Sequence, residues 1–150
     1  MFKHLLVPLD GSKLAEAALP SARALAEKFD GTITLLRVVW PPDITTSTVG
    51  TQMTEVLSIL SEHSQQEAST YLGQLQSALR RDGYMVQRHI VMGDAVAEII
   101  LETATSENID AIVMSTHGRG GLSRWVFGSV ADKVLRQAQI PVLLIRSHPE

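Results

Sequence analysis

The sequence predicts an α/β fold in which five parallel strands form a doubly wound, Rossmann-like sheet with helices on both faces, in a single domain. Short apolar runs alternate along the chain with longer segments whose apolar residues recur at helical spacing. Runs that are apolar throughout are typical of strands in a parallel sheet that is covered on both faces. Right-handed crossovers then wind such a sheet in both directions. The 150 residues are enough for one domain of this kind.

Five segments are predicted strands, because each is a short apolar run with turn residues nearby. They are residues 4–9, 32–39, 85–91, 110–115 and 141–146. The second of them, TITLLRVV, is rich in the β-branched residues that favour strands. The sequence Asp10-Gly11-Ser12 after the first strand is typical of a turn and a helix N-cap.

Four segments, residues 13–29, 53–79, 95–106 and 129–137, are predicted helices. Pro20 lies inside the first and should kink it or end a first turn there. The second has a polar middle, so its first half is either part of one helix or a separate, lid-like segment. Met53 and Met85 are expected to fill the core. The apolar stripe of the second helix comprises Val56, Leu60, Tyr71, Leu72, Leu75 and Leu79.

The composition excludes several classes of protein. A formal net charge of −3 argues against a partner nucleic acid, which requires a broad basic face. No run approaches the roughly 20 apolar residues of a membrane span, and the first residues lack a signal-peptide layout. There is no cysteine, and the five histidines have no metal-ligand spacing. We therefore expect a cytoplasmic protein without a membrane or nucleic-acid partner.

The most informative segment is residues 112–130, IVMSTHGRGGLSRWVFGSV. A strand leads into three glycines, and a helix is predicted to begin at Gly128-Ser129. Glycines let the backbone approach an anion closely, and a helix N-terminus adds unpaired N–H groups with a partial positive charge. Arg119 adds a cation and Ser129 a hydroxyl. The segment is therefore predicted to hold phosphate, although it is neither a P-loop nor a Rossmann fingerprint.

The other candidate residues also follow strands. Asp10 follows the first strand, Val38 lies near the end of the second, and Met92 follows the third. In doubly wound sheets ligands bind beyond the carboxyl ends of the strands, near the topological switch point. We therefore expect these residues to meet at one edge of the sheet.

The chain resembles the universal stress protein family over nearly its whole length. The opening KHLLVPLDGSKLAEAAL, the segment VMGDAVAEII and the C-terminal stretch from Ile112 to Arg146 carry the resemblance. The nucleotide-binding branch has glycine, two residues, glycine, nine residues, then glycine with serine or threonine. Gly118 and Gly128-Ser129 match this pattern, whereas Ser115 occupies the position of the first glycine. Because serine is small, we expect the strand end to remain open to a nucleotide.

The resemblance implies a binding site for ATP, ADP or AMP, with any Mg²⁺ arriving together with the nucleotide. It implies that Asp10 lies beside the ribose or adenine and that Val38 and Met114 bound the base. It also implies a homodimer that pairs through the last strand, here Val142, Leu143, Leu144, Ile145 and Arg146. The full set of predicted nucleotide-binding residues is Pro8, Leu9, Asp10, Val38, Met92, Met114, Ser115, His117, Gly118, Arg119, Gly121, Gly128, Ser129 and Val130.

Two of these residues have competing interpretations. Asp10 is either a ribose or base contact or a turn and capping residue. His117 could act as an acid or base, but no carboxylate is evidently placed to orient it, which favours loop packing or a hydrogen bond to the ligand. No residue is therefore assigned to catalysis.

Three functions remain open from the sequence. The first is an adenine-nucleotide-binding stress-response protein. The second is a nucleotide-free dimeric interaction protein on the same fold, which Ser115 favours. The third is a slow ATPase or phosphotransferase; efficient turnover is not expected, because Asp10 is the one obvious carboxylate near the phosphate-holding groups.

Overall fold

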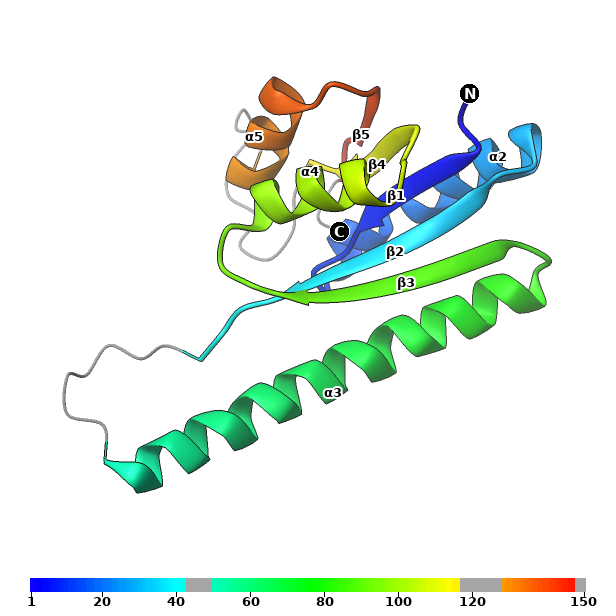
Figure 1. Cartoon of the computed structure of the whole chain (residues 1–150). Coiled ribbons are helices and arrows are strands. Elements are labelled where there is room, and N and C mark those ends of the chain that lie inside the picture. Colours follow the sequence, from blue (N-terminus) through cyan, green and yellow to red (C-terminus); the bar gives the residue numbers. More distant parts are fainter. Residues whose placement is uncertain (43–49, 117–127, 148–150) are drawn as a thin grey trace.

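The computed structural model of the protein describes residues 1–42, 50–116 and 128–147. Its five strands are all parallel and lie in the order β3-β2-β1-β4-β5 (Figure 1). The strands are β1 His4–Pro8, β2 Thr32–Val39, β3 Met85–Met92, β4 Ala111–Ser115 and β5 Val142–Ile145. The predicted fold class is therefore confirmed, and each strand end lies within one residue of its predicted position.

Helices cover both faces of this sheet, and each face has its own apolar core. The helices are α1 Lys13–Glu16, α2 Leu19–Phe29, α3 Thr51–Arg81, α4 Val96–Ser106 and α5 Ser129–Gln137. One core joins α1, α2 and α3 to side chains such as Leu5, Val7 and Leu35. The other joins α4 and α5 to the opposite face, where Leu6 and Ile112 are fully buried. Alternate residues of β1 thus enter different cores, as the two-residue period of a strand requires.

Pro20 divides the predicted first helix into two. Helix α1 ends at Glu16, and α2 begins at Leu19 with Pro20 in its first turn. Proline is tolerated there because the first N–H groups of a helix have no intrahelical partner. The sequence left open whether Pro20 kinks one long helix or ends a first helical turn, and the structure shows the second of these.

Helix α3 is continuous over 31 residues, so its first half is not a separate segment. Its polar middle does not interrupt the helix, because only a narrow stripe has to contact the sheet. The expectation that Met53 and Met85 fill the core is wrong: their side chains are 47% and 53% exposed. Among the described residues, no helix is long and apolar enough to span a bilayer.

The outer edge of β3 is covered by side chains of α3. The carbonyl oxygen of Val86 accepts hydrogen bonds from Gln76 Nε2 at 3.0 Å and from Arg80 Nη2 at 2.7 Å. Arg88 of β3 donates in the other direction, to the carbonyl oxygen of Ser69 at 2.6 Å. The two bonds to Val86 occupy a backbone carbonyl group that this edge strand would otherwise present to another chain.

The amino end of β1 is held by a residue from a distant part of the chain. Asp110 Oδ2 accepts the backbone N–H groups of Lys3 at 2.9 Å and His4 at 3.0 Å. Burial alone would raise the pKa of the Asp110 carboxyl, but these two donors outweigh it and lower the pKa. Asp110 directly precedes β4, so this contact ties the start of β4 to the start of β1, its neighbour in the sheet.

Candidate functional site

The strand order locates the topological switch point between β1 and β4. The chain moves from β1 outward to β2 and β3, and then returns to the other side of β1 to form β4 and β5. The carboxyl ends of β1 and β4, at Pro8 and Ser115, therefore flank the place where connections leave the sheet in opposite directions. Ligands of open α/β sheets bind at this place.

Asp10 shapes the turn that follows β1. Its Oδ1 accepts the N–H of Ser12 at 2.9 Å and the hydroxyl of Ser12 at 2.5 Å. Ser12, not Asp10, is the N-cap of α1, because Ser12 Oγ accepts the N–H of Ala15 at 3.1 Å. Gly11 between them has φ of +88°, a conformation that glycine adopts without strain. Asp10 is thus a turn-forming residue, and a contact with a ligand would be additional to this role.

Three side chains that the sequence did not suggest as site residues surround this turn: Arg37, Tyr71 and Glu16. The guanidinium of Arg37 on β2 lies 3.6–3.7 Å from where a side chain on Gly11 would begin. The hydroxyl of Tyr71 on α3 donates to Glu16 Oε1 at 2.9 Å, which ties α3 to α1. Burial first, and then this bond to Glu16, raise the pKa of the Tyr71 hydroxyl. The sequence could have pointed to this neighbourhood through Arg37, because it is the single charged residue of β2.

The other side of the switch point joins β4 to the start of α5. The N–H of Gly128 donates to the carbonyl oxygen of Thr116 at 2.9 Å, and α5 begins at the next residue. A Cβ atom at Gly128 would lie 3.1 Å from that carbonyl oxygen, so this close approach suits glycine. The first turn of α5, which includes Ser129 and Val130, therefore lies beside the end of β4. Its N–H groups carry the partial positive charge of a helix N-terminus.

Ser115, the departure from the glycine pattern, has a structural partner. Its hydroxyl donates to the hydroxyl of Ser147 at 2.8 Å, and both residues are buried. The N–H of Thr116 also donates to the carbonyl oxygen of Ile145 at 2.9 Å. The end of β4 is thus tied to the segment that follows β5. Sequence analysis missed Thr116 and Ser147: Thr116 occupies a variable position of the glycine pattern, and Ser147 belongs to no recognisable motif.

The predicted apolar contacts do not all share one face. Val38 and Met114 both pack in the core beneath α4 and α5, and Met114 is 6% exposed. Leu9 belongs to the opposite core, next to the half-buried Pro8. Met92 also faces α3, where its sulfur accepts the hydroxyl of Ser61 at 3.6 Å. The structure therefore brings Val38 and Met114 together but separates Met92 from them.

Four predicted phosphate or ligand contacts lie outside the described residues. They are His117, Gly118, Arg119 and Gly121. The described part of the site consists of the Asp10 turn, the end of β4 and the start of α5.

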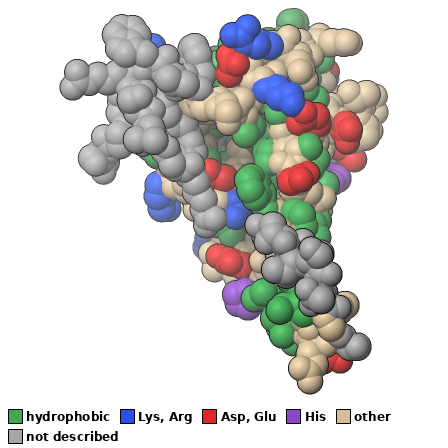
Figure 2. Space-filling view, turned by 90° about the vertical axis from the view of Figure 1, so that its left-hand side faces the viewer, with side chains coloured by type: hydrophobic (Ala, Val, Ile, Leu, Met, Phe, Trp, Pro, Cys, Tyr) green, Lys and Arg blue, Asp and Glu red, His purple; other side chains and the backbone are tan. Residues whose placement is uncertain are grey.

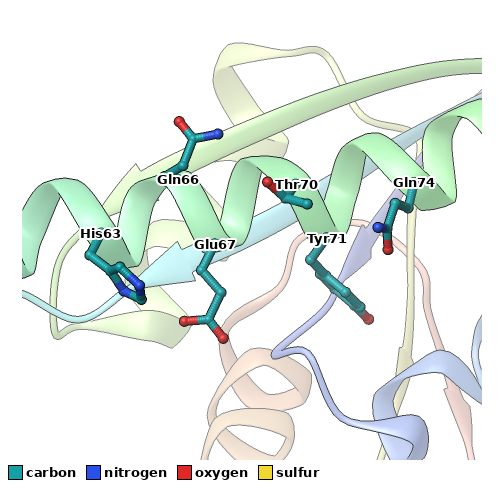
Figure 3. Close-up of a pocket in the computed structure, with 6 residues that line it drawn as sticks. All are labelled: His63, Gln66, Glu67, Thr70, Tyr71 and Gln74. Carbon is teal, nitrogen blue, oxygen red and sulfur yellow. The ribbon is translucent and has the colours of Figure 1, made fainter.

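An open groove of about 380 Å³ lies along α3 beside this site. His63, Glu67 and Tyr71, spaced four residues apart, project to the same side of the helix (Figure 3). Tyr71 belongs both to the groove and, through Glu16, to the neighbourhood of Asp10. Within residues 1–42, 50–116 and 128–147, no group of three or more potential metal ligands is close enough together to hold an ion. The groove is lined by His63, Gln66, Glu67, Thr70, Tyr71 and Gln74.

Comparison with known proteins identifies close likenesses over the whole chain. The model of the universal stress protein family matches residues 1–146. Universal stress protein MJ0531 of Methanocaldococcus jannaschii is 30% identical over 146 residues, which cover 97% of this chain and 83% of the relative. Universal stress protein MJ0577 of the same organism is 27% identical and is covered over 96% of its length.

Solved structures share the fold as well. The structure of MJ0577 has a TM-score of 0.86 at 28% identity and covers 100% of this chain and 99% of its own. The universal stress protein UspA of Lactobacillus plantarum has a TM-score of 0.82 at 26% identity, with 97% and 98% covered. A third universal stress protein, solved in complex with cAMP, has a TM-score of 0.70 at 17% identity, with 96% and 97% covered, and it supports the fold alone.

Proposed function

Because this chain belongs to the universal stress protein family, we propose that it is an adenine-nucleotide-binding stress-response protein, with ATP, ADP or AMP as its ligand. The nucleotide would lie across the switch point, between the Asp10 turn and the start of α5. The observation that carries this proposal is the contact between Gly128 and Thr116, at 2.9 Å, which directs the first turn of α5 to the carboxyl end of β4. An anion there would meet unpaired N–H groups and the positive end of the helix dipole.

The two sides of the site suggest how the nucleotide would be oriented. Phosphates suit the side of α5, where Ser129 and Val130 begin the helix. The ribose suits the side of Asp10, because its Oδ1 is already engaged by Ser12 and the carboxylate would repel phosphate. Gly118 and Arg119, in the segment that joins β4 to α5, would complete the phosphate contacts. Any Mg²⁺ would arrive with the nucleotide. We propose binding without efficient turnover, because phosphoryl transfer requires metal ligands and a positioned nucleophile.

The two edges of the sheet favour a homodimer through β5. The outer edge of β3 is engaged by Gln76 and Arg80 of α3. At the opposite edge, Leu143 of β5 is 40% exposed. An exposed, apolar edge strand commonly pairs with another chain. We therefore propose that Val142–Ile145 pairs with the same strand of a second copy.

Calorimetric titration with ATP and Mg²⁺, and with ADP and AMP separately, tests the ligand. We expect saturable binding to the purified protein and a higher melting temperature in millimolar ATP, since a ligand that binds only the folded state stabilises it. Replacing Gly118 with a bulky residue should abolish this binding while the protein remains folded. No heat and no shift with any of the three nucleotides would overturn the proposal and favour the nucleotide-free interaction protein.

A further inference from the structure

Arg37 is an unusual residue for the strand that carries it. It is the single charged residue of β2, whose other side chains are apolar apart from two threonines. The side chain of Arg37 is half-buried, and its Nε atom is buried completely. Burying a cation is costly unless opposite charges lie close to it. A guanidinium at this position therefore requires acidic groups nearby.

Two carboxylates lie around the turn that the Arg37 guanidinium approaches. The guanidinium lies 3.6–3.7 Å from where Cβ would begin on Gly11, the residue next to Asp10. Glu16 reaches the same neighbourhood from α1, because its Oε1 accepts the hydroxyl of Tyr71 at 2.9 Å. Burial is the main reason why the pKa of the Tyr71 hydroxyl is raised, but the charges of Glu16 and Asp10 also raise it and that of Arg37 lowers it. The three charged groups and the phenol thus form one electrostatic cluster, here called the turn cluster.

The negative charge of the turn cluster is offset mainly by Arg37. Lys13 also pairs with Glu16, at 3.2 Å, but its side chain is 93% exposed, so solvent and salt weaken this interaction. Figure 2, which views the molecule from the carboxyl ends of the strands, shows acidic and basic side chains close together on this face. Without the guanidinium, the Asp10 turn would carry negative charge that no buried cation of the turn cluster compensates.

We propose that Arg37 determines how much phosphate charge the candidate site accepts, by offsetting the carboxylates of Asp10 and Glu16. This inference rests on the proposed function, in which the nucleotide lies between the Asp10 turn and the start of α5. An uncompensated turn would repel phosphate across the site, whereas a compensated turn leaves the positive end of α5 to attract it. Arg37 would therefore act through the charge of the turn and not through a bond to the ligand.

A purely structural role for Arg37 makes different predictions. If Arg37 only held the turn in place, its removal would weaken the binding of every ligand, including one without charge. Uncompensated carboxylates instead weaken the binding of a ligand according to its negative charge, and salt reduces the effect. ATP and adenosine separate the two roles, because they share the base and the ribose but adenosine has no phosphate.

The experiment starts from Arg37→Met, which removes the charge and keeps a long, unbranched side chain in the half-buried position. Calorimetric titrations with ATP and with adenosine measure the affinities. We expect the affinity for ATP to fall about tenfold and that for adenosine to change by less than about twofold. The loss for ATP should shrink as the salt concentration is raised. Arg37→Lys keeps the charge and should retain most of the affinity for ATP.

Glu16→Gln tests the same balance of charge from the acidic side. Added to Arg37→Met, it should restore much of the affinity for ATP, because it removes one carboxylate while the amide oxygen can still accept the bond from Tyr71. In the otherwise unchanged protein, Glu16→Gln should raise the affinity for ATP several-fold and leave that for adenosine unchanged. This second variant tests the proposal without any change at Arg37.

Arg23→Met is the matched control. It also removes one positive charge, but Arg23 pairs with Asp82, at 3.1 Å, and Asp82 is the C-cap of α3. The affinity for ATP should be unchanged in this control. A similar loss in Arg23→Met and Arg37→Met would show that only the net charge of the protein matters, and it would overturn the proposal.

The remaining outcomes separate this inference from the proposed function. Equal losses of affinity for ATP and adenosine in Arg37→Met, or a loss that Glu16→Gln does not reduce, would overturn the role of Arg37 while the wild type still binds ATP. In that case the proposed function would stand. A wild-type protein that binds neither ligand would overturn the proposed function and this inference with it.

Discussion

The hydroxyl of Ser115 donates a hydrogen bond to the hydroxyl of Ser147 at 2.8 Å, in a buried setting. Ser115 is the last residue of β4, and Ser147 follows the end of β5 by two residues. The residue that departs from the nucleotide-binding glycine pattern therefore fastens the segment that follows the last strand. The bond to Ser147 explains why a serine is present at this position without assuming that the chain has lost nucleotide binding.

Replacing Ser115 with alanine should lower the free energy of unfolding by about 1 kcal/mol, because the buried hydroxyl of Ser147 loses its donor. Chemical denaturation of S115A, S147A and the double variant measures this loss. We expect the double variant to be less destabilised than the sum of the single variants, since the two residues interact. Strictly additive losses would contradict the bond. Affinity for ATP should fall little in S115A.

Gly128→Ala should weaken both the fold and ATP binding. The new Cβ would lie 3.1 Å from the carbonyl oxygen of Thr116 and should cost about 1 kcal/mol as the backbone shifts. Gly50→Ala is the matched control, because Gly50 is also an N-cap glycine without a side-chain cap bond and has open space around it. Thermal unfolding and calorimetry with ATP measure both effects. Equal losses in the two variants would show that the contact with Thr116 is unimportant.

Tyr71→Phe should destabilise the protein by about 1 kcal/mol, because the phenyl ring keeps the packing but loses the bond to Glu16. The raised pKa of Tyr71 also predicts the dependence on pH. A raised pKa in the folded state means that its stabilising contribution is present below the usual tyrosine pKa of 10.0 and is lost as the pH rises above it.

Ultraviolet absorbance during an alkaline titration checks this, since the chain has two tyrosines. One phenol should ionise late in the wild type, and that late phase should be missing in Tyr71→Phe. A late phase that survives the substitution would assign the effect to the other tyrosine and contradict the prediction.

Asp110→Asn should reduce stability at neutral pH by about 1 kcal/mol and make it less dependent on pH in acid. The pKa of Asp110 is lowered in the folded protein, so its contribution is present above the usual value of 3.8 and is lost as the pH falls through the folded pKa. Denaturation curves at neutral pH and near pH 3 measure the difference between wild type and variant. A difference that is as large in acid as at neutral pH would rule out the charged capping role.

The periodicity of the sequence was sufficient to predict the sheet and its helices, because strands such as TITLLRVV alternate with segments of clear helical spacing. The same periodicity failed for Val56 and Leu60, which were assigned to a buried stripe but are 48% and 52% exposed. A stripe shows which side of a helix is apolar, but it does not show whether anything lies beneath it. The length of α3 relative to β3 decides that, and it is a property of the tertiary structure.

The candidate site could be predicted from the sequence where its residues follow chain order, but not where they meet through tertiary contacts. Asp10 and Gly128 were found because they follow a strand and precede a helix. Glu16 and Tyr71 were missed as site residues, because they are 55 residues apart and meet only after α3 packs beside α1. Val38 and Met92 were expected on the same side of the sheet, but they face opposite sides. Met92 pairs with Val39, one position further along β2, and successive residues of a strand point to opposite faces.

The position of β1 at the centre of the sheet constrains the order in which the chain can fold. Pairing with β2 requires only the adjacent crossover, whereas Asp110 meets Lys3 across 107 residues. The loop-closure entropy of that long connection has to be overcome before β1–β4 pairing contributes any stability. The half containing β1, β2 and β3 can therefore collapse early, and the candidate site, which needs β4 and α5, forms last. During synthesis, the amino-terminal half would wait with one side of its central strand unpaired until residues near 115 have emerged.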